Sequence, residues 1–279
     1  MPADLHCHTR ISDGSITLDD LILLAKRRNI TTISVTDHDT VAGVTRAKVL
    51  GDRFGVEVIP GAEFSCYDSK NKNKVHLLAY LFDHPDRLEG LCKRTGEARK
   101  KASLQCLSKV MRYYPITSEM VARVATGSTN IFKQHIMHTL MNAGYSCSVF
   151  GELFDKLFDS KNGSCIVHPE YPDVFEVLEL LQSSGAVTVL AHPSVYDSMP
   201  LLPDLIDAGL DGVEVWHPRN TEADRTELLG IAERHGLVTT GGSDFHGMYS
   251  AGPNPFGSCT TPDAALAVLR ARKERKKKK

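Results

Sequence analysis

Short β-branched segments alternate with helical segments along most of this chain, and this alternation limits the folds that the chain can adopt. Seven segments have strand character, at residues 3–9, 32–36, 56–59, 74–82, 187–191, 212–216 and 237–240. Helical segments lie between them, and one begins with a capping-box pattern formed by Thr17 and Asp20. Such alternation is typical of parallel strands covered by helices. Seven strands favour a barrel over an open sheet.

A long helical stretch interrupts this alternation. From about residue 86 to residue 157 the pattern predicts helix after helix, without β-branched runs. We interpret it as an insertion. The expected organisation is a barrel domain at residues 1–85 and 185–269, a helical insertion subdomain at 86–184 and a basic tail at 270–279. The expected fold class is therefore α/β, a seven-stranded (β/α) barrel with a helical insertion.

The charge of the chain is distributed unevenly. The sequence has 33 Lys and Arg residues and 34 Asp and Glu residues, a formal net charge of −1. The tail at 270–279 holds eight of the basic residues and one acid, which leaves 25 basic and 33 acidic residues elsewhere. An acidic body with 12 His residues favours cation binding. We expect no catalytic role for the tail.

The sequence carries no pattern typical of export or of membrane insertion. No stretch approaches the roughly 20 apolar residues of a membrane span, and the N-terminus lacks the regions of a secretory signal. The seven Cys residues are scattered and form no C-x-x-C pair, as in a reduced protein. We therefore expect a cytoplasmic protein without membrane contact. The sequence does not indicate the oligomeric state.

Residues of metal-binding type recur where the predicted strands end. His6 and His8 flank one residue, so the two-residue period of a strand points both imidazoles to the same side. In parallel β/α proteins, functional residues gather at the carboxyl ends of strands. Nine side chains at such positions are candidate ligands: His6, His8, Asp13, His38, Glu63, His76, His192, Asp244 and His246.

The type and number of these residues indicate the metal and the reaction. His together with carboxylate favours Mn²⁺, Fe²⁺ or Zn²⁺ over Mg²⁺ and Ca²⁺. Nine candidates exceed what one ion needs, so we expect two or three clustered ions. Clustered ions suit hydrolysis at phosphorus, because they generate hydroxide and neutralise the developing charge. Isolated histidines are usually ordinary surface or core residues, and we interpret five in this way: His84, His135, His138, His168 and His235.

The motifs and their order resemble the PHP (polymerase and histidinol phosphatase) family. The resemblance extends from residue 4 to about residue 260. Its motifs are His6-x-His8 with Asp13-Gly14, Thr36-Asp37-His38-Asp39, Gly61-x-Glu63, His76, Ala191-His192-Pro193 and Ser243-Asp244-x-His246. The resemblance implies that the seven-stranded barrel is distorted and that it holds three divalent ions, commonly Mn, Zn or Fe.

The resemblance also implies how the ligands would be shared among three ions. The first set is His6, His8, Glu63 and Asp244. The second set is Asp13, His38 and His246. The third set is His76, His192 and Glu63, which would bridge two ions.

Family members of this insertion-bearing type act on small phosphate esters. They include nucleotide-bisphosphate phosphatases, oligoribonucleases and cyclic phosphodiesterases, whereas the polymerase-associated type is not expected because no polymerase body is attached. The bisphosphate phosphatases hold phosphate with an Arg-containing segment, but the corresponding residues 127–133 contain no Arg. Lys133 either replaces that Arg or is an ordinary helix-surface residue.

The expected function is therefore that of a metal-dependent phosphoesterase. Its substrate would be a small cyclic or bis-phosphorylated sugar or nucleotide, and a metal-bridging hydroxide would attack phosphorus in line with the leaving oxygen. The alternative is a 5'-3' oligoribonuclease or a 3',5'-nucleotide bisphosphate phosphatase. Short RNA is accordingly a second candidate partner.

Three residues beside the ligand pattern are predicted to take part in catalysis. We expect Arg219 to hold phosphate, and His217 to contact phosphate or to donate a proton to the leaving group. A helix-capping turn with a solvated Arg is the alternative for this pair. Asp37 is expected to face the cations from outside the ligand set, unless it only caps a helix. Lys133 completes the predicted substrate-binding set with His217 and Arg219.

Two other functions stay open. An amide or lactam hydrolase would use the same metals, but such barrel enzymes generally carry a carboxylated Lys or another His pattern, and no Lys occupies a strand-end ligand position here. A non-catalytic RNA-binding protein would use the basic tail. Its RNA binding would survive loss of His6 or Asp244 and would be lost when residues 270–279 are deleted.

Overall fold

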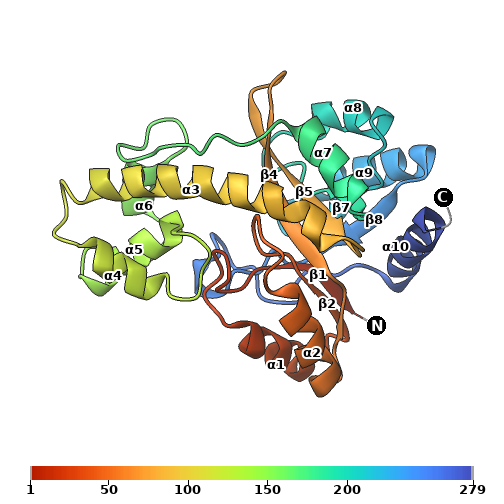
Figure 1. Cartoon of the computed structure of the whole chain (residues 1–279), viewed down its shortest axis with the longest axis horizontal. Helices are drawn as coiled ribbons and strands as arrows, with labels where there is room; N and C mark the ends of the chain where they lie inside the picture. Colours follow the sequence, from red (N-terminus) through yellow and green to blue (C-terminus); the bar gives the residue numbers. More distant parts are fainter. Residues whose placement is uncertain (1, 278–279) are drawn as a thin grey trace.

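The computed structural model describes residues 2–277, which form two β-sheets with helices packed around them (Figure 1). The first sheet is parallel, with the order β1 (Ala3–Cys7), β2 (Thr32–Val35) and β3 (Glu57–Val58). The second sheet has the order β4 (Gly61–Asp68), β5 (Asn73–Tyr80), β6 (Val187–Leu190), β7 (Gly212–Trp216) and β8 (Val238–Gly241). In it, β5 runs antiparallel to both β4 and β6.

The α/β class is confirmed, but the predicted seven-stranded barrel is not. The described strands form a three-stranded and a five-stranded sheet, and these do not close into one barrel. The strand expected at 56–59 ends before Pro60, which has no N–H to donate to a ladder. A separate strand, β4, then forms a hairpin with β5 through the polar turn at 69–72. Alternation alone did not reveal this hairpin, because β4 is poor in β-branched residues.

Helices cover both sheets. Against the first sheet lie α1 (Leu18–Arg27) and α2 (Val44–Phe54), whose Leu21 and Leu50 share a core with Ile33. The second sheet is covered by α7 (Val174–Ser183), α8 (Leu202–Asp207) and α9 (Glu222–His235). Thr17 caps α1, since its hydroxyl accepts a hydrogen bond from the Asp20 amide at 3.1 Å, which is one half of the predicted capping box; the Asp20 carboxylate accepts from the Thr17 hydroxyl at 2.6 Å and not from the Thr17 amide.

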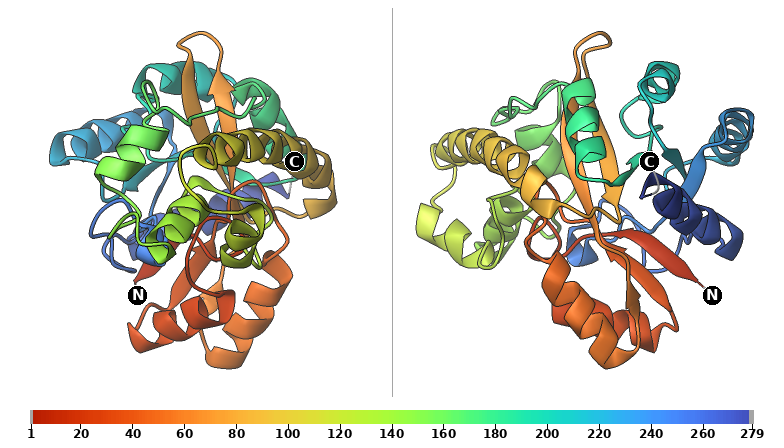
Figure 2. Two further views of the ribbon diagram at one scale, coloured as in Figure 1. Left: turned by 90° about the vertical axis from the view of Figure 1, so that its left-hand side faces the viewer. Right: turned by 45° about the vertical axis from the view of Figure 1, so that its right-hand side comes forward.

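The long helical stretch contains α3 (Glu89–Val110), α4 (Ser118–Val124), α5 (Lys133–Asn142) and α6 (Glu152–Phe158). These helices lie on the side of the molecule opposite the two termini (Figures 1 and 2). They enclose a core of their own, which includes Leu107, Leu140 and Phe158. By contrast, Val177 and Leu181 of α7 pack into the core of the second sheet. Residues 2–277 also contain three short 3-10 helices: η1 (Pro85–Leu88), η2 (Met199–Leu201) and η3 (Gly247–Tyr249).

The basic C-terminal segment begins as a packed helix, α10 (Asp263–Lys276). The ammonium of Lys273 is buried, pairs with Asp83 and donates to the Gly185 carbonyl at 2.7 Å. Lys276 pairs with Asp211. Part of the predicted tail therefore fixes α10 against the sheet, whereas Lys278 and Lys279 lie outside the described residues. Among residues 2–277, no helix combines the length and the apolar character that crossing a membrane requires.

Candidate metal centre

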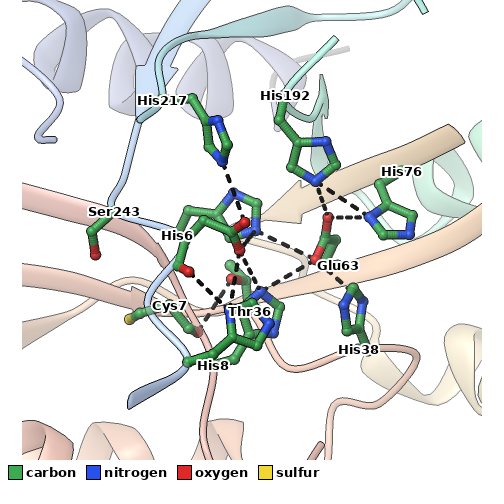
Figure 3. A network of polar contacts seen from close by, with 12 residues as sticks. His6, Cys7, His8, Thr36, His38, Glu63, His76, His192, His217 and Ser243 are labelled. Atoms are coloured by element: carbon green, nitrogen blue, oxygen red, sulfur yellow. Dashed lines mark hydrogen bonds and ion pairs between the residues drawn. The ribbon is translucent and has the colours of Figure 1, made fainter. Parts of the chain in front are cut away.

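The two sheets meet near the carboxyl ends of β1, β2, β6 and β8, and all nine predicted ligands converge there. Figure 3 labels six of them: His6, His8, His38, Glu63, His76 and His192. Two isolated parallel bridges join the sheets at this point, between Cys7 and Phe245 and between His38 and Glu63. A Cβ atom at Gly242 would lie 2.3 Å from the His6 amide nitrogen, so the chain after β8 approaches β1 closely because this position is glycine. This approach brings Asp244 and His246 to the histidines of β1.

Two of the candidate ligands have a strained backbone. His192 and Asp244 adopt φ values of 24° and 49°, in the left-handed region that non-glycine residues rarely occupy. Such a conformation costs about 1–3 kcal/mol and persists where the surroundings enforce it. Here the His192 amide donates to Glu214 Oε2 at 2.8 Å, and the Ser243 amide donates to Asp4 Oδ1 at 2.9 Å.

Glu63 is the centre of the cluster, and its two oxygens face different groups of imidazoles (Figure 3). Oε1 lies 2.6 Å from His76 Nδ1 and 2.8 Å from His192 Nε2. Oε2 lies 3.2–3.3 Å from three nitrogens: His38 Nδ1, His6 Nε2 and His8 Nε2. A carboxylate placed in this way can bridge two cations.

Two further carboxylates complete the cluster. Asp13 Oδ1 lies 3.3 Å from His246 Nε2, and Asp13 Oδ2 lies 3.8 Å from His38 Nε2. Asp13 is held by Gln134 of α5, whose amide donates to Oδ2 at 3.1 Å. Asp244 Oδ1 lies 3.3 Å from His8 Nε2. The helical stretch thus contacts the cluster directly.

Buried polar atoms of the cluster lack hydrogen bonds, and this supports binding of divalent cations. Within residues 2–277, six such atoms have no hydrogen-bond partner: His6 Nε2, His8 Nδ1 and Nε2, His38 Nδ1, Glu63 Oε2 and His192 Nδ1. An unpaired buried polar atom is costly unless a cation or water satisfies it. Four overlapping groups place their ligand atoms within 4.8 Å of one another: His8, Asp13, His38 and His246; His6, His8 and Asp244; His6, Glu63 and His192; His38, Glu63 and His76.

Glu63, His76 and His38 have the protonation states of a metal site, whereas the surrounding carboxylates raise the pKa of His6, His8 and His246 despite their burial, so a cation would have to displace protons from these three. Burial alone would raise the pKa of Glu63, but His76, His38 and His6 hold it well below its ordinary value. Burial lowers the pKa of His76 to about 3 despite the nearby Glu63 carboxylate, and it holds the pKa of His38 well below its ordinary value. Ionised carboxylates and neutral imidazoles are the forms that bind metals.

Two buried carboxylates behind the cluster escaped the sequence analysis. Glu214 belongs to β7, and its Oε1 lies 2.9 Å from His6 Nδ1. Its other oxygen, Oε2, accepts a hydrogen bond from the His192 amide. Asp4 of β1 accepts hydrogen bonds from the backbone amides of His6 and Ser243. Both are fully buried. A sequence signal did exist, because each is an acidic residue inside a short predicted strand, and the rest of β7 is apolar.

The predicted catalytic residues Asp37, His217 and Arg219 differ in their placement. Asp37 is buried and accepts hydrogen bonds from the Thr9 hydroxyl at 2.7 Å and the Ser12 hydroxyl at 2.6 Å, so it fixes the loop that carries Asp13.

His217 is buried, and its ring points toward the cluster (Figure 3). Its Nδ1 accepts the Arg219 amide at 3.1 Å, which leaves Nε2 to donate to Asp244 Oδ2 at 3.3 Å. The Arg219 side chain, by contrast, is exposed and lines a cavity.

This cavity has a volume of about 340 Å³ and opens onto the cluster. Candidate ligands line it, among them Asp13, Glu63 and Asp244. Further lining residues come from the β4–β5 hairpin, the helical stretch and the loops that follow α6 and β6, with Lys133 among them. His168, which the sequence analysis interpreted as an ordinary residue, also lines this cavity.

The sequence matches the PHP domain over residues 4–171. A phosphoribosyl 1,2-cyclic phosphate 1,2-diphosphodiesterase of Eggerthella lenta is 38% identical over 257 residues, which cover 91% of this chain and 97% of that protein. The 5'-3' exoribonuclease Rnm of Escherichia coli is 29% identical over 253 residues, which cover 87% of this chain and 84% of that protein.

The structure is similar to the solved structure of a protein from Bifidobacterium adolescentis. The function inferred for that protein is that of a metal-dependent phosphoesterase. The TM-score is 0.87 at 30% sequence identity, and the match covers 98% of each chain. The likeness therefore includes the helical stretch as well as both sheets.

Proposed function

The chain belongs to the PHP domain family of metal-dependent phosphoesterases, and from this premise we propose that it hydrolyses the cyclic phosphate diester of a phosphorylated ribose. The relative from Eggerthella lenta, by its name, acts on such a substrate and aligns over nearly its whole length. The observation that carries the proposal is the convergence of three carboxylates and six imidazoles in one cluster, of which the three carboxylates and four of the imidazoles line a cavity of about 340 Å³.

We propose that the cluster binds three divalent ions of Mn, Fe or Zn. The two oxygens of Glu63 face separate imidazole groups, and Asp13 and Asp244 each face further histidines. When bound, such ions would lower the pKa of water and neutralise charge on the phosphate oxygens. The ligand sets are those that the family resemblance implies, with Glu63 as the bridge.

Three side chains outside the ligand sets have proposed roles in binding the substrate and in positioning the ligands. We propose that the exposed guanidinium of Arg219 holds the phosphate that reacts, since this side chain lines the cavity beside Asp244. His217 orients Asp244 from behind through its Nε2. Asp37 positions the loop that carries Asp13.

The bond changes follow from this arrangement. The oxygen of water bonds to phosphorus, one ester P–O bond breaks, and the freed sugar oxygen takes a proton. A second hydrolysis of the resulting monoester releases inorganic phosphate.

A nucleotide or short RNA substrate is the second candidate. Phe150 and Phe154 line the cavity, and aromatic side chains are what a nucleobase stacks against. A 3',5'-bisphosphorylated nucleotide or the 5' end of an RNA would place its base there.

Phosphate release from a substrate panel tests the proposal. The full chain is reconstituted separately with Mn²⁺, Fe²⁺ and Zn²⁺ and is given phosphoribosyl 1,2-cyclic phosphate, a nucleoside 3',5'-bisphosphate, a short 5'-phosphorylated RNA, and an amide and a lactam. We expect the highest kcat/KM with the cyclic phosphate and no amide hydrolysis. A higher kcat/KM with the bisphosphate or the RNA would favour the second candidate. Hydrolysis of the amide alone would refute both.

A further inference from the structure

Helix α5 of the helical stretch reaches the candidate metal centre at two points. Gln134 lies in its first turn and His138 lies one turn further along, so the two side chains share one face of the helix. Gln134 Nε2 donates to Asp13 Oδ2 at 3.1 Å. His138 Nδ1 lies 2.6 Å from the hydroxyl of Tyr249, which follows the candidate ligand His246 by three residues. One helix face therefore reaches the segments that carry two candidate ligands.

Tyr249 belongs to the core of the helical stretch, although it lies in the loop that follows β8. Its side chain is buried and shares that core with Ile136 and Leu140 of α5. Its ring lies edge-on to two histidines of the same helix, with its centre 5.6 Å from that of His138 and 5.8 Å from that of His135. Burial raises the pKa of Tyr249 to about 12, so the hydroxyl keeps its proton and can donate it to His138 Nδ1. Tyr249 therefore anchors η3 on α5.

The other side of η3 is held by Ser15, which belongs to the same loop as Asp13. The Ser15 amide donates to the His246 carbonyl at 3.0 Å, and the Ser15 hydroxyl accepts from the Met248 amide at 2.8 Å. Gly247 has a φ of 65°, and a Cβ atom at this position would overlap Ser15 Oγ, so the close approach depends on glycine. A shift of η3 on α5 would therefore also displace the loop that carries Asp13.

A third contact joins the start of α5 to the cluster. Phe132 is the N-cap of the helix, and its ring centre lies 6.3 Å from that of the candidate ligand His38, in a stacked arrangement. The second set of candidate ligands consists of Asp13, His38 and His246, whose ligand atoms lie within 4.8 Å of one another. Through Phe132, Gln134 and Tyr249, α5 therefore contacts each ligand of this set or the segment that carries it.

We propose that α5 positions the ligands of the second ion, through Gln134 and through the pair formed by Tyr249 and His138. The inference rests on the proposed function, because the arrangement of three ions belongs to it, but it concerns metal affinity and not the ester. Loss of a group that orients a ligand typically lowers metal affinity roughly 10- to 100-fold. Because coupling between two sites is reciprocal, an ion bound by this set should in turn stabilise α5. The helical stretch is then part of the metal centre as well as of the cavity lining.

Metal binding to the full chain tests the proposal without any substrate. The unchanged chain, Gln134→Met and Tyr249→Phe are equilibrated in buffers of decreasing free Mn²⁺, and the Mn²⁺ bound per chain is measured by inductively coupled plasma mass spectrometry. In both variants we expect one equivalent of Mn²⁺ to dissociate at a free concentration roughly 10- to 100-fold higher than in the unchanged chain. The remaining equivalents should dissociate as they do in the unchanged chain.

Matched variants control for the chemical change itself. Gln105→Met and Tyr113→Phe make the same substitutions at exposed positions of the helical stretch, and their Mn²⁺ binding curves should equal that of the unchanged chain. The double variant of Tyr249→Phe with His138→Leu should lose no more affinity than Tyr249→Phe alone, because both changes remove the same link. Additive losses would show that Tyr249 does not act through His138.

Amide hydrogen exchange of α5 separates positioning from a general loss of stability. In the unchanged chain, Mn²⁺ should slow exchange in residues 133–142, because the ion holds the ligands that this helix contacts. In Tyr249→Phe, the slowing should require the higher free Mn²⁺ concentration at which the weakened equivalent binds. General destabilisation would instead speed exchange to the same extent with and without Mn²⁺.

The outcomes distinguish this inference from the proposed function. Unchanged Mn²⁺ binding in Gln134→Met and Tyr249→Phe, or an equal weakening of every equivalent, would overturn the inference and leave the proposed function in place. If the metal-loaded chain hydrolyses no phosphate ester while the selective loss of one equivalent persists, the proposed function fails and the positioning role of α5 stands.

Discussion

Glu214 Oε1 and His6 Nδ1 lie 2.9 Å apart, so a buried carboxylate of the second sheet fixes a candidate ligand of the first sheet. The other oxygen of Glu214 accepts the amide of His192 at 2.8 Å. This carboxylate therefore holds two histidines from different strands in register. A group that orients a ligand in this way also fixes its tautomer, since Nδ1 carries the proton and Nε2 is left free for a metal.

The first prediction concerns this orienting carboxylate. Glu214→Gln keeps the shape but removes the charge, and an amide nitrogen facing His6 Nδ1 would favour the wrong tautomer. We expect metal affinity or kcat to fall about 10- to 100-fold, as for other residues that orient ligands. Metal content by mass spectrometry and phosphate release measure the effect. Glu227→Gln, an exposed change on α9, is the matched control. Full metal content together with a wild-type rate in Glu214→Gln would show that the contact is dispensable.

The second prediction concerns the bridging carboxylate. Glu63→Ala removes both oxygens that face the separate imidazole groups, so it should uncouple the ions and abolish turnover. The bound metal per chain should decrease as well. Measurement of metal content and of phosphate release at saturating metal checks this. A near-normal rate in a metal-replete Glu63→Ala protein would refute the bridged arrangement.

The third prediction is a pH dependence that originates at Lys133. Burial lowers its pKa to about 8; Lys74 and Arg99 act in the same direction, whereas Cys106 and Asp159 act against it. The ammonium is therefore charged below about pH 8 and neutral above it. KM for phosphoribosyl 1,2-cyclic phosphate should rise as the pH increases through 8.

The Lys133→Arg variant supplies the control for this pH dependence. Its guanidinium stays protonated, so KM should lack the rise near pH 8. KM profiles of both proteins, measured from pH 6 to 9.5, decide the matter. The same rise in both would assign it to another group.

The fourth prediction concerns the C-terminal helix. Lys273→Met leaves Asp83 and the Gly185 carbonyl without their shared donor, which should lower the free energy of unfolding by about 1–3 kcal/mol. Lys277→Met removes only an exposed pair with Glu274 and should have little effect. Urea unfolding of the two variants measures the difference. Equal stabilities would mean that α10 does not depend on this buried ammonium.

Sequence reasoning found the candidate ligands because each lies in or just after a strand, where the fold gathers side chains at one end. It missed the β4–β5 hairpin, since β4 has no β-branched residue and its segment was not predicted as a strand. Pro60 and the polar turn at 69–72 were the available signals.

The residues that support the cluster were harder to find than the ligands. Glu214 and Asp4 act through contacts between strands that are distant in sequence, and Arg99 reaches the cavity only because α3 extends from the sheets to the other helices (Figure 1). Their roles depend on tertiary packing, which no local pattern encodes. The role of Lys273 depends on packing in the same way.

The central claim is that the cluster hydrolyses an ester by attack of water on phosphorus. The most direct test measures whether ¹⁸O from labelled water is incorporated into the released phosphate. Metal-loaded protein is incubated with phosphoribosyl 1,2-cyclic phosphate in ¹⁸O-labelled water, and the products are analysed by mass spectrometry. Attack at phosphorus predicts ¹⁸O in the inorganic phosphate and none in ribose 5-phosphate beyond the slow exchange seen without enzyme. Enzyme-dependent label in the sugar, with unlabelled phosphate, would place the cleavage at carbon and contradict the account.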